Sequence, residues 1–375
     1  MQADLHHMSE KDGREILPWL KLQATPGIGA LRFARLIEKL KHPARVLNTP
    51  EETLSAISGI SSRMAAAIRD TARLPDAPFL REIRMAGDQG VHLIGLGMEA
   101  YPELLSKIPD PPPVLYVRGQ LLPDAVAVAI VGSRNATRYG RDHAFSIASE
   151  LAASGIVVVS GLARGIDAAA HEGALAAGGV TIAVLGSGLS RIYPGEHRRL
   201  AQSIAASGAV ISSFAMETLP DAPNFPARNR IISGLCLGTA VMEAADRSGS
   251  LITARMAGEQ GRDVFALPGN VRSMKSAGTH RLLREGACLI ENAADIMNEL
   301  GIQKPHVSVR PHEKKENLLA MDESGVFKVL EADPIHIDEL AQRTGMAAGP
   351  LSALLFTLEL QGKILQYPGK YFAKS

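Results

Sequence analysis

The sequence predicts an α/β protein built around a doubly wound parallel sheet, with a smaller module before it and another after it. Between residues 110 and 300, short apolar runs alternate with longer stretches of helical pattern. The runs are continuously hydrophobic, which indicates strands covered on both faces. Each gap is long enough for a right-handed crossover helix. We therefore expect a Rossmann-like sheet, with strands at 125–131, 156–160, 180–185, 209–212, 239–244 and 263–267.

Composition restricts the function classes. The 375 residues include 40 Lys and Arg against 39 Asp and Glu, a formal net charge of +1. This excludes a histone-like polycation, so a polyanion would have to be held by a local patch. A hydrophobic content of 46% excludes a mainly disordered chain. Aromatic residues make up only 4%, which is low for a β-sandwich or a carbohydrate site.

The cysteines and the apolar segments predict the compartment. Cys236 and Cys288 lie inside apolar runs, and we expect buried thiols in a reducing cytoplasm rather than a disulfide framework or a zinc site. The N-terminal MQADLHHMSEKDGRE lacks the apolar core of a signal peptide. The apolar stretches are far shorter than the ~20 residues that cross a membrane. We expect a cytoplasmic protein without a membrane segment.

Residues 1–80 are predicted to form an all-α domain. TPGIG precedes an amphipathic helix at 30–40, and SGISSRMAAAIRD at 58–70 repeats a looser form of the same unit. The pair is similar to a double helix-hairpin-helix in a SAM-like domain, in which glycine amides and a helix N-terminus can face a phosphate. We favour a plain packing module, because only Arg32, Arg35 and Arg63 supply nearby charge.

After the core domain, 81–300, we predict a polar linker at 301–320 and a compact unit at 321–375. In that unit a helix ending at Gly345, a second amphipathic helix and a short hairpin follow one another, which is the order of a winged helix. The second helix, LSALLFTLELQG, carries almost no base-reading or phosphate-binding side chains. We therefore favour a protein-contact or packing role for it over DNA reading.

The candidate site lies in the loops after the strands, because ligands of doubly wound sheets bind at the strand carboxyl ends. The first loop reads VGSRNATRYG, in which a glycine allows close approach and an arginine can grip a phosphate beside a helix start. It is not GxGxxG, so an ordinary dinucleotide site is unsupported. The next two loops again combine glycine with arginine. The candidates from these three loops are Gly132, Ser133, Arg134, Ser160, Gly161, Arg164, Gly186, Arg191 and Tyr193.

A fourth segment, PNFPARNRIISGL, adds an aromatic residue and two more cations. Phe225 is bracketed by prolines, and Arg228 and Arg230 flank Asn229 at an expected helix start. Cations there oppose the helix dipole and need an anionic partner. The alternative is a pair of solvated arginines, or a structural pair with Glu243. The loop after the fifth strand contributes Arg247, Ser248 and Gly249.

The sequence offers little for catalysis. Asp167 and His171 are four residues apart on one helical face and could be an acid/base pair, but we favour a structural role at the helix start. Neither a metal-ligand cluster nor a nucleophile elbow accompanies the arginines. We expect a site that holds phosphates in series, with no metal, no cofactor, no catalytic residue and no enzymatic activity.

Five motifs of the core domain resemble those of a known family. IVGSRNATRYG, VVVSGLARGIDAAAHEGAL, GGVTIAVLGSGLSRIYPGEH, FPARNRIISGL and EAADRSGSLITA together resemble the bacterial DNA-processing protein A family, also called DprA or Smf, over about residues 100–295. The resemblance implies a homodimer that binds single-stranded DNA and helps load the RecA recombinase in natural transformation and recombination.

Carried onto this chain, the resemblance makes Arg134 the arginine of the GSR motif, and Arg228 and Arg230 the basic pair of the FPxRNR loop. Phe225 is then placed to stack on a base. Members often read SEY where this chain has Ser212, Ser213 and Phe214, so any role for that loop is in doubt.

Two other function classes are alternatives. One is a phosphoribohydrolase on a related sheet, which uses a PGGxGT loop and a catalytic glutamate; the nearest run here, LPGNVRS at 267–273, lacks that loop. The other is a protein-only scaffold whose glycine loops are structural.

Overall fold

The computed structural model describes residues 10–302, 326, 329–330, 334–360 and 363–374. Residue contacts divide the chain into two compact units, Met1–Lys304 and Pro305–Ser375. Each unit is described by itself. Among the described residues, no helix is both long enough and apolar enough to cross a membrane.

The first unit begins with helices. They are α1 (Glu10–Gln23), α2 (Ala30–Leu40), α3 (Pro43–Asn48), α4 (Glu51–Ser55), α5 (Ser62–Ala72) and α6 (Ala77–Asp88). The two predicted hairpins precede α2 and α5 and turn at Gly27 and Gly59, whose φ angles of +83° and +84° suit glycine. The Arg32 guanidinium donates to the carbonyls of Gly27, at 3.0 Å, and Gly59, at 3.2 Å. Arg32 therefore ties the hairpins together.

A nine-stranded sheet follows, in the order β1-β2-β6-β5-β4-β3-β7-β8-β9. From β6 to β9 all neighbouring strands are parallel, whereas β2 runs antiparallel to both β1 and β6. The order reverses between β3 and β7, which is the topological switch point of a doubly wound fold. The strands are β1 (Val91–Gly95), β2 (Val114–Gly119), β3 (Ala127–Val131), β4 (Val157–Ser160), β5 (Thr181–Val184), β6 (Ala209–Ser212), β7 (Gly238–Val241), β8 (Asp263–Ala266) and β9 (Cys288–Leu289).

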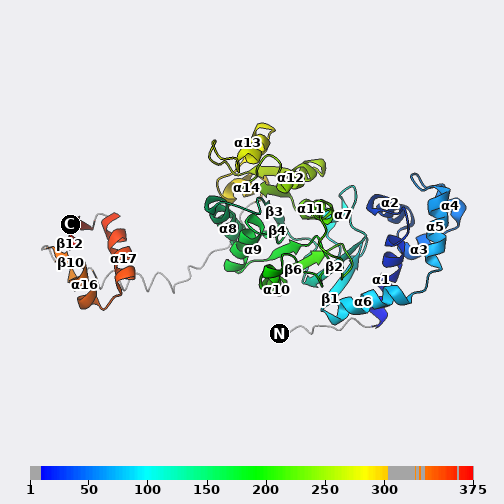
Figure 1. The fold of residues 1–375 in the computed structure, drawn as a ribbon, viewed down its shortest axis with the longest axis horizontal. Coiled ribbons are helices and arrows are strands. Elements are labelled where there is room, and N and C mark those ends of the chain that lie inside the picture. Colours follow the sequence, from blue (N-terminus) through cyan, green and yellow to red (C-terminus); the bar gives the residue numbers. More distant parts are fainter. Residues whose placement is uncertain (1–9, 303–325, 327–328, 331–333, 361–362, 375) are drawn as a thin grey trace. The chain divides into compact units, whose positions relative to one another are not determined.

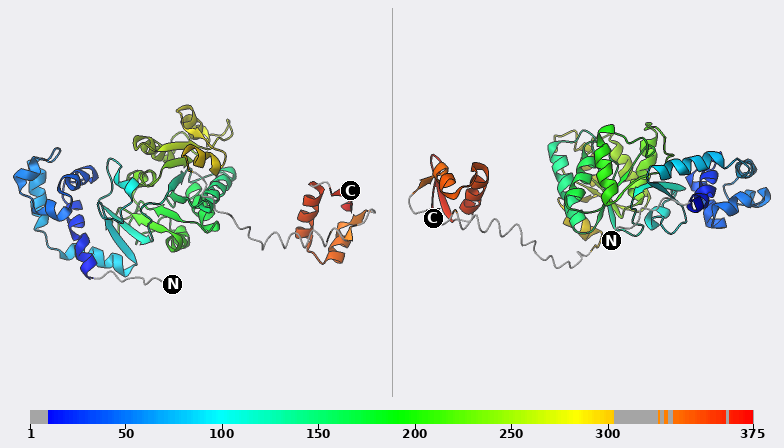
Figure 2. Two further views of the ribbon diagram at one scale, coloured as in Figure 1. Left: turned by 180° about the vertical axis from the view of Figure 1, so that it is seen from behind. Right: turned by 90° about the horizontal axis from the view of Figure 1, so that it is seen from below.

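Helices cover both faces of this sheet (Figures 1 and 2). Alternate residues of β3 belong to two separate hydrophobic cores, Val128 and Ile130 to one and Ala127, Ala129 and Val131 to the other. The first core also takes residues of α8 (Arg138–Ala153), α9 (Ile166–Ala176) and α14 (Ala293–Glu299). The second takes residues of α10 (Arg198–Ser207), α11 (Asn224–Gly234) and α12 (Gly249–Glu259). The remaining short elements are α7 (Glu103–Ser106), η1 (Gly195–His197) and α13 (Ala277–Arg284).

The fold class predicted from the sequence is confirmed, with one correction. The six expected strands correspond to β3–β8. The sheet is not purely parallel, because β1 and β2 extend it with an antiparallel pair, and β9 extends the other edge. These three strands lie outside the alternating strand–helix pattern on which the prediction depended.

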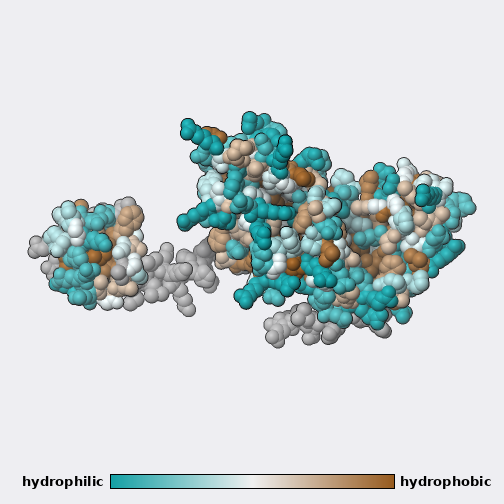
Figure 3. Space-filling view, viewed as in Figure 1, coloured by the Kyte–Doolittle hydropathy of each residue, from teal (hydrophilic) through white to brown (hydrophobic). Residues whose placement is uncertain are grey.

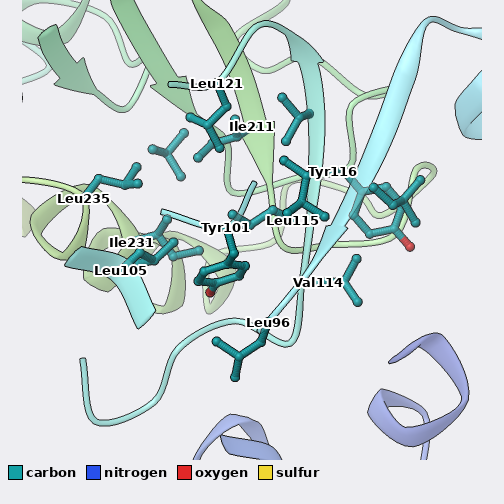
Figure 4. Packing of buried hydrophobic residues seen from close by; sticks show 14 of the residues in the cluster. Leu96, Tyr101, Leu105, Val114, Leu115, Tyr116, Leu121, Ile211, Ile231 and Leu235 are labelled. Atoms are coloured by element: carbon teal, nitrogen blue, oxygen red, sulfur yellow. The ribbon is translucent and has the colours of Figure 1, made fainter. Parts of the chain in front are cut away.

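The N-terminal helices share the second core with the sheet, rather than forming a core of their own. The Trp19 indole nitrogen donates to the Leu96 carbonyl at 3.0 Å, and the Trp19 ring lies so close to Gly95 that a Cβ there would collide with it. Figure 4 shows the next part of this core, where Leu96, Tyr101 and Leu105 gather with β2 and with α11. Helix α6 spans residue 80, where the sequence predicts the end of the N-terminal domain. That domain boundary stays a prediction.

The second unit contains α16 (Ile337–Thr344), α17 (Ala348–Leu360) and a three-stranded antiparallel sheet in the order β10-β12-β11. Its strands are β10 (Ile335–His336), β11 (Ile364–Tyr367) and β12 (Tyr371–Lys374). Helix α16 ends at Gly345, as predicted, with φ of +70°. The unit has its own small core, which includes Leu340, Leu355 and Phe372. Of the predicted linker 301–320, only residues 301 and 302 are described.

Candidate functional site

The loops at the strand carboxyl ends of the first unit enclose a groove of about 660 Å³. A neighbouring cavity of about 370 Å³ shares Arg134, Phe225 and Arg228 with it. We call the two together the central groove. Most of the residues predicted from the sequence line it: Gly132, Ser133, Arg134, Gly161, Arg164, Tyr193, Phe225, Arg228, Asn229, Arg247, Ser248 and Gly249. Segments far apart in the sequence therefore converge on one rim.

The loop after β3 is held rigidly while its arginine stays exposed. The Ser133 amide donates to the Glu243 carbonyl at 2.8 Å, and the Ser133 carbonyl accepts from the Ile166 amide at 3.2 Å. A Cβ at Gly132 would lie 2.5 Å from Ile166 Cγ1, so only glycine lets α9 pack there. Arg134, next in the chain, remains exposed at the rim.

An aromatic ring lies between polar groups at the mouth of the groove. The Arg134 guanidinium carbon lies 4.9 Å from the centroid of the Phe225 ring, a cation–π contact. The Tyr193 ring centroid is 5.9 Å from that of Phe225. Gly186 does not line the groove, but a Cβ there would lie 2.9 Å from Phe225 Cδ1. Gly186 therefore serves the site by leaving room for the ring.

The structure corrects the expectation that Arg228 is an exposed phosphate ligand at a helix start. Helix α11 begins at Asn224, so Arg228 lies in its second turn, and it is only 4% exposed. Its guanidinium donates to the Gly161 carbonyl at 2.7 Å and to the Val184 carbonyl. Burial lowers the pKa of Arg228 to about 10, so the group stays charged at neutral pH. It forms part of the groove floor and joins the ends of β4 and β5.

Asp167 supplies a negative charge at this floor, because it also lines the groove. Its carboxylate accepts from the Gly161 amide at 3.2 Å and from the Ala163 amide at 3.3 Å. Burial raises the pKa of the Asp167 carboxyl, and the positive charge of Arg228 opposes that shift. Asp167 thus fixes the loop after β4 from below, which agrees with the structural role we favoured.

The expectation that Arg230 binds phosphate in the groove is also corrected. It lies on another side of α11, outside the groove, with its side chain 16% exposed. Its Nε is 3.4 Å from an Asp110 carboxylate oxygen and donates to the Ala227 carbonyl at 3.0 Å. Burial lowers the pKa of Arg230, and Asp110 opposes the shift. Arg230 anchors the segment before β2 to α11.

The remaining arginines differ in whether they form ion pairs with neighbouring carboxylates. Arg164 at the groove forms an exposed ion pair with Glu196. Arg191 lies outside the groove and is 3.6 Å from the Glu217 carboxylate. Exposed pairs of this kind are worth only about 0–1 kcal/mol, so a ligand can replace them at little cost. Arg247 is exposed and makes no ion pair with any described residue.

Helix α12 begins at the groove. Ser248 caps it, with its hydroxyl accepting from the Ser250 amide at 3.4 Å, and Gly249 follows without any atom near its missing Cβ. The Asn229 side chain donates to the Gly249 carbonyl at 3.4 Å. Backbone amides of this first turn have no partner within the helix and favour an anion.

Ser160 and His171 do not reach the groove. Ser160 is fully buried, and its hydroxyl donates to the Ile130 carbonyl of the neighbouring strand at 2.6 Å, so the expectation that it binds phosphate is corrected. His171 Nδ1 lies 2.8 Å from the Thr181 hydroxyl, and burial lowers its pKa to about 3. Asp167 and His171 thus have different hydrogen-bond partners and do not form an acid/base pair.

Glu243 has a structural partner, but not an arginine. Its carboxylate accepts from the Thr137 amide at 3.2 Å and from the Thr137 hydroxyl at 2.5 Å. Thr137 is the N-cap of α8. The suggested pairing of Glu243 with Arg228 and Arg230 is therefore wrong, because both arginines bond elsewhere.

Among the residues that the sequence analysis did not single out, Asn135 lines the groove and Lys275 contacts Asn135. Asn135 lines both cavities, and its position directly after Arg134 could have revealed it. Lys275, from the loop after β8, donates to the Asn135 carbonyl at 2.6 Å. No sequence signal places Lys275 there, because the contact spans 140 residues. Among the described residues, no group of His, Cys, Asp or Glu could hold a metal ion.

Comparison with known proteins agrees with this geometry. Residues 92–301 match the family described as DNA recombination-mediator protein A, and residues 310–370 match the DprA winged helix domain. Protein Smf of Escherichia coli K12 is 42% identical over 288 residues, which cover 75% of this chain and 76% of that protein. The DNA processing protein DprA of Streptococcus pneumoniae R6 is 46% identical over 202 residues, covering 54% and 71%.

Two solved structures are similar to the chain. DNA processing protein A from Streptococcus pneumoniae superposes with a TM-score of 0.66 at 35% identity, covering 75% of this chain and 97% of that one. DNA processing protein A from Helicobacter pylori, whose structure is described as giving insight into its single-stranded DNA binding mode, has a TM-score of 0.51 at 34% identity. That match covers 56% of this chain and 95% of the other.

Proposed function

Because this chain belongs to the DNA recombination-mediator protein A family, we propose that its central groove binds single-stranded DNA. The observation that carries the proposal is the exposed Arg134 beside the Phe225 ring, at the rim of a groove that also contains Arg247 and the start of α12. Cations and backbone amides suit phosphates, and an aromatic ring suits an unpaired base.

The proposed complex is sequence-tolerant. Any base has a face that can stack on Phe225, and the groove offers no helix or ribbon aimed at a duplex groove. We expect the strand to displace Glu196 from Arg164 and Arg134 from the ring, so that both guanidinium groups become free for phosphates. Arg228 contributes a fixed positive charge beneath the strand rather than a mobile phosphate contact.

We extend the proposal to the biological role. The protein would protect incoming single strands in the cytoplasm and help load the RecA recombinase on them, as a homodimer and without catalysing a reaction. These parts rest on family membership.

A titration of labelled oligo-dT against the wild type and Arg134→Ala, Arg247→Ala and Phe225→Leu variants tests the groove assignment. Each arginine variant should lower the affinity and make the slope of log affinity against log salt shallower by about 0.7, the value for one phosphate on a single strand. Phe225→Leu should weaken binding without changing the slope. Equal competition by duplex and single strand, or release of a free base from nucleoside monophosphates, would contradict the proposal.

A further inference from the structure

The small sheet of the second unit carries an aromatic row on its outer face. His336, Tyr371 and Tyr367 are directly paired across β10, β12 and β11. Directly paired residues lie on the same face of a sheet with neighbouring side chains. The His336 and Tyr371 rings accordingly meet edge to face, with centroids 5.0 Å apart.

This outer face is partly open: Ala373 on it is buried, whereas its direct partner Leu365 is 49% exposed. Ile364 and Phe372, whose side chains alternate with the row, are buried in the core against α17. On the outer face, by contrast, Tyr367 and Tyr371 are 41% and 42% exposed. Tyr is enriched at binding interfaces, because its ring combines an apolar body with a polar end.

Cations accompany these rings. The hairpin segment 361–374 contains Lys363, Lys370 and Lys374 and no Asp or Glu. Lys363 and Lys370 are exposed. Helix α17, the usual DNA-reading element of a winged helix, has the opposite character, because it contains no Lys or Arg. Positive charge and exposed aromatic rings thus coincide on the sheet and not on the helix.

We propose that this sheet face is a second binding surface for single-stranded nucleic acid, with bases stacking on Tyr367 and Tyr371 and phosphates near Lys363 and Lys370. Stacking on sheet aromatics beside cations is the usual mode of sequence-tolerant single-strand recognition. The hairpin carries lysines and no carboxylate, and the nearest acidic group on the row is Asp338, 3.5 Å from His336 at the β10 end. Positive charge at the β11–β12 end favours a polyanion there. The surface would engage a strand already held by the central groove, and only in this respect does the inference rest on the function proposed above.

Full-length variants test this surface. Tyr367→Ala/Tyr371→Ala should weaken binding of an oligo-dT of about 40 nucleotides at least about fivefold, and leave binding of one of about 6 nucleotides unchanged, since the short strand fills only one site. Tyr367→Phe/Tyr371→Phe keeps both rings and should bind like the wild type. Phe356→Ala removes another exposed ring, on α17, and serves as the matched control with no expected loss.

The lysines give a readout that does not depend on the tyrosines. Lys363→Gln/Lys370→Gln should make the salt slope for the long oligonucleotide shallower by about 1.4, at about 0.7 for each contact. This variant also decides the question if the alanine pair unfolds the unit. An unchanged slope would overturn the proposal, as would equal losses from the alanine pair and from Phe356→Ala.

Photocrosslinking separates this surface from the central groove. A strand carrying 5-iodouracil should crosslink to Tyr367 or Tyr371 in the wild type, and single-stranded competitor should remove the crosslink more readily than duplex. Absence of crosslinks, or preferential competition by duplex, contradicts a single-strand surface here. If the short oligonucleotide fails to bind while these crosslinks form, the central-groove proposal fails and the sheet surface stands.

Discussion

At the scale of single residues, arginines of similar sequence context have different physical roles. Arg134 and Arg247 are exposed at the groove, whereas Arg228 is buried and bonds to two backbone carbonyls. The difference arises from which side of its element each side chain occupies. Residue type alone therefore does not separate a ligand-binding arginine from one that supports the floor.

This contrast predicts opposite effects of two alanine substitutions. Arg228→Ala should lower the free energy of unfolding by about 1–3 kcal/mol, because it leaves the buried Gly161 and Val184 carbonyls without their donor. Arg247→Ala should change stability by less than about 0.5 kcal/mol and weaken oligo-dT binding about tenfold, the value of one charge-assisted hydrogen bond. Urea unfolding and anisotropy titration on both variants measure this. A stable Arg228→Ala protein that binds DNA poorly would restore Arg228 as a direct phosphate ligand.

His171 predicts a pH dependence of stability. Its pKa falls from 6.5 in a free chain to about 3 in the folded protein, because burial disfavours the charged ring. Below pH 6.5 the unfolded chain therefore binds more protons than the folded one, and stability is lost as the pH falls toward 3. His171→Gln should remove up to about 1.4 kcal/mol per pH unit from that slope.

The measurement is urea unfolding at several pH values between 4 and 7, with His143→Gln on α8 as the control for loss of a histidine. His143 is only partly buried and contacts the Tyr139 carbonyl. An identical slope in the wild type and His171→Gln would show that His171 does not take up a proton on unfolding.

At the scale of elements, the strands and their loops were predictable because their signal is local. Continuous apolar runs identified β3 to β8, and glycine with arginine after each run identified most of the groove. The antiparallel β1 and β2 were missed, because they join the sheet only through the pairing of β2 with β6, whose segments lie about 90 residues apart. For the same reason nothing in the sequence showed that Asp110 would take Arg230 away from the groove.

Gly165 is the element-scale position most sensitive to substitution. It precedes α9 with φ of +78°, and a Cβ there would lie 2.8 Å from the Arg134 carbonyl oxygen. Gly165→Ala should therefore displace the loop that presents Arg134 and weaken DNA binding, in addition to lowering stability. Gly178→Ala is the matched control, since Gly178 has φ of +69° but open space around it.

Gly178→Ala measures the cost of a positive φ in open space, about 1–2 kcal/mol. Gly165 also has ψ of −119°, outside the left-handed helical region, so the excess loss of stability in Gly165→Ala combines backbone strain with the collision at the loop carbonyls. The excess loss of affinity reports the displaced loop. Equal behaviour of the two variants in thermal unfolding and in oligonucleotide titration would show that the contact at Gly165 does not position the loop that presents Arg134.

At the scale of the whole molecule, the chain combines a large unit that contains the central groove with a small unit that has its own core. A chain ending at residue 304 should keep the fold of the first unit and bind a short oligo-dT with unchanged affinity, because the groove residues all precede that point. Circular dichroism and anisotropy check this prediction. Loss of short-strand binding in a folded truncated protein would place part of the central site in the second unit.

The face of the molecule seen in Figure 3 is mainly hydrophilic over the sheet of the first unit, with hydrophobic residues scattered singly or in small groups. Scattered apolar residues of this kind are normal for a protein surface. The N-terminal helices and the sheet of this unit instead bury their large hydrophobic residues in one common core.

That shared core limits how this protein can be recombined with its relatives. A chimera joined near residue 80 would cut through α6 and take Trp19 from a different protein than Gly95 and Leu96. The Trp19 ring packs directly on Gly95 and its indole nitrogen donates to the Leu96 carbonyl. The smallest exchangeable block therefore extends from the first helix through β2, and its inner residues must match those of the recipient sheet. In calorimetry the same coupling means that the helices and the sheet melt in a single cooperative transition rather than in two.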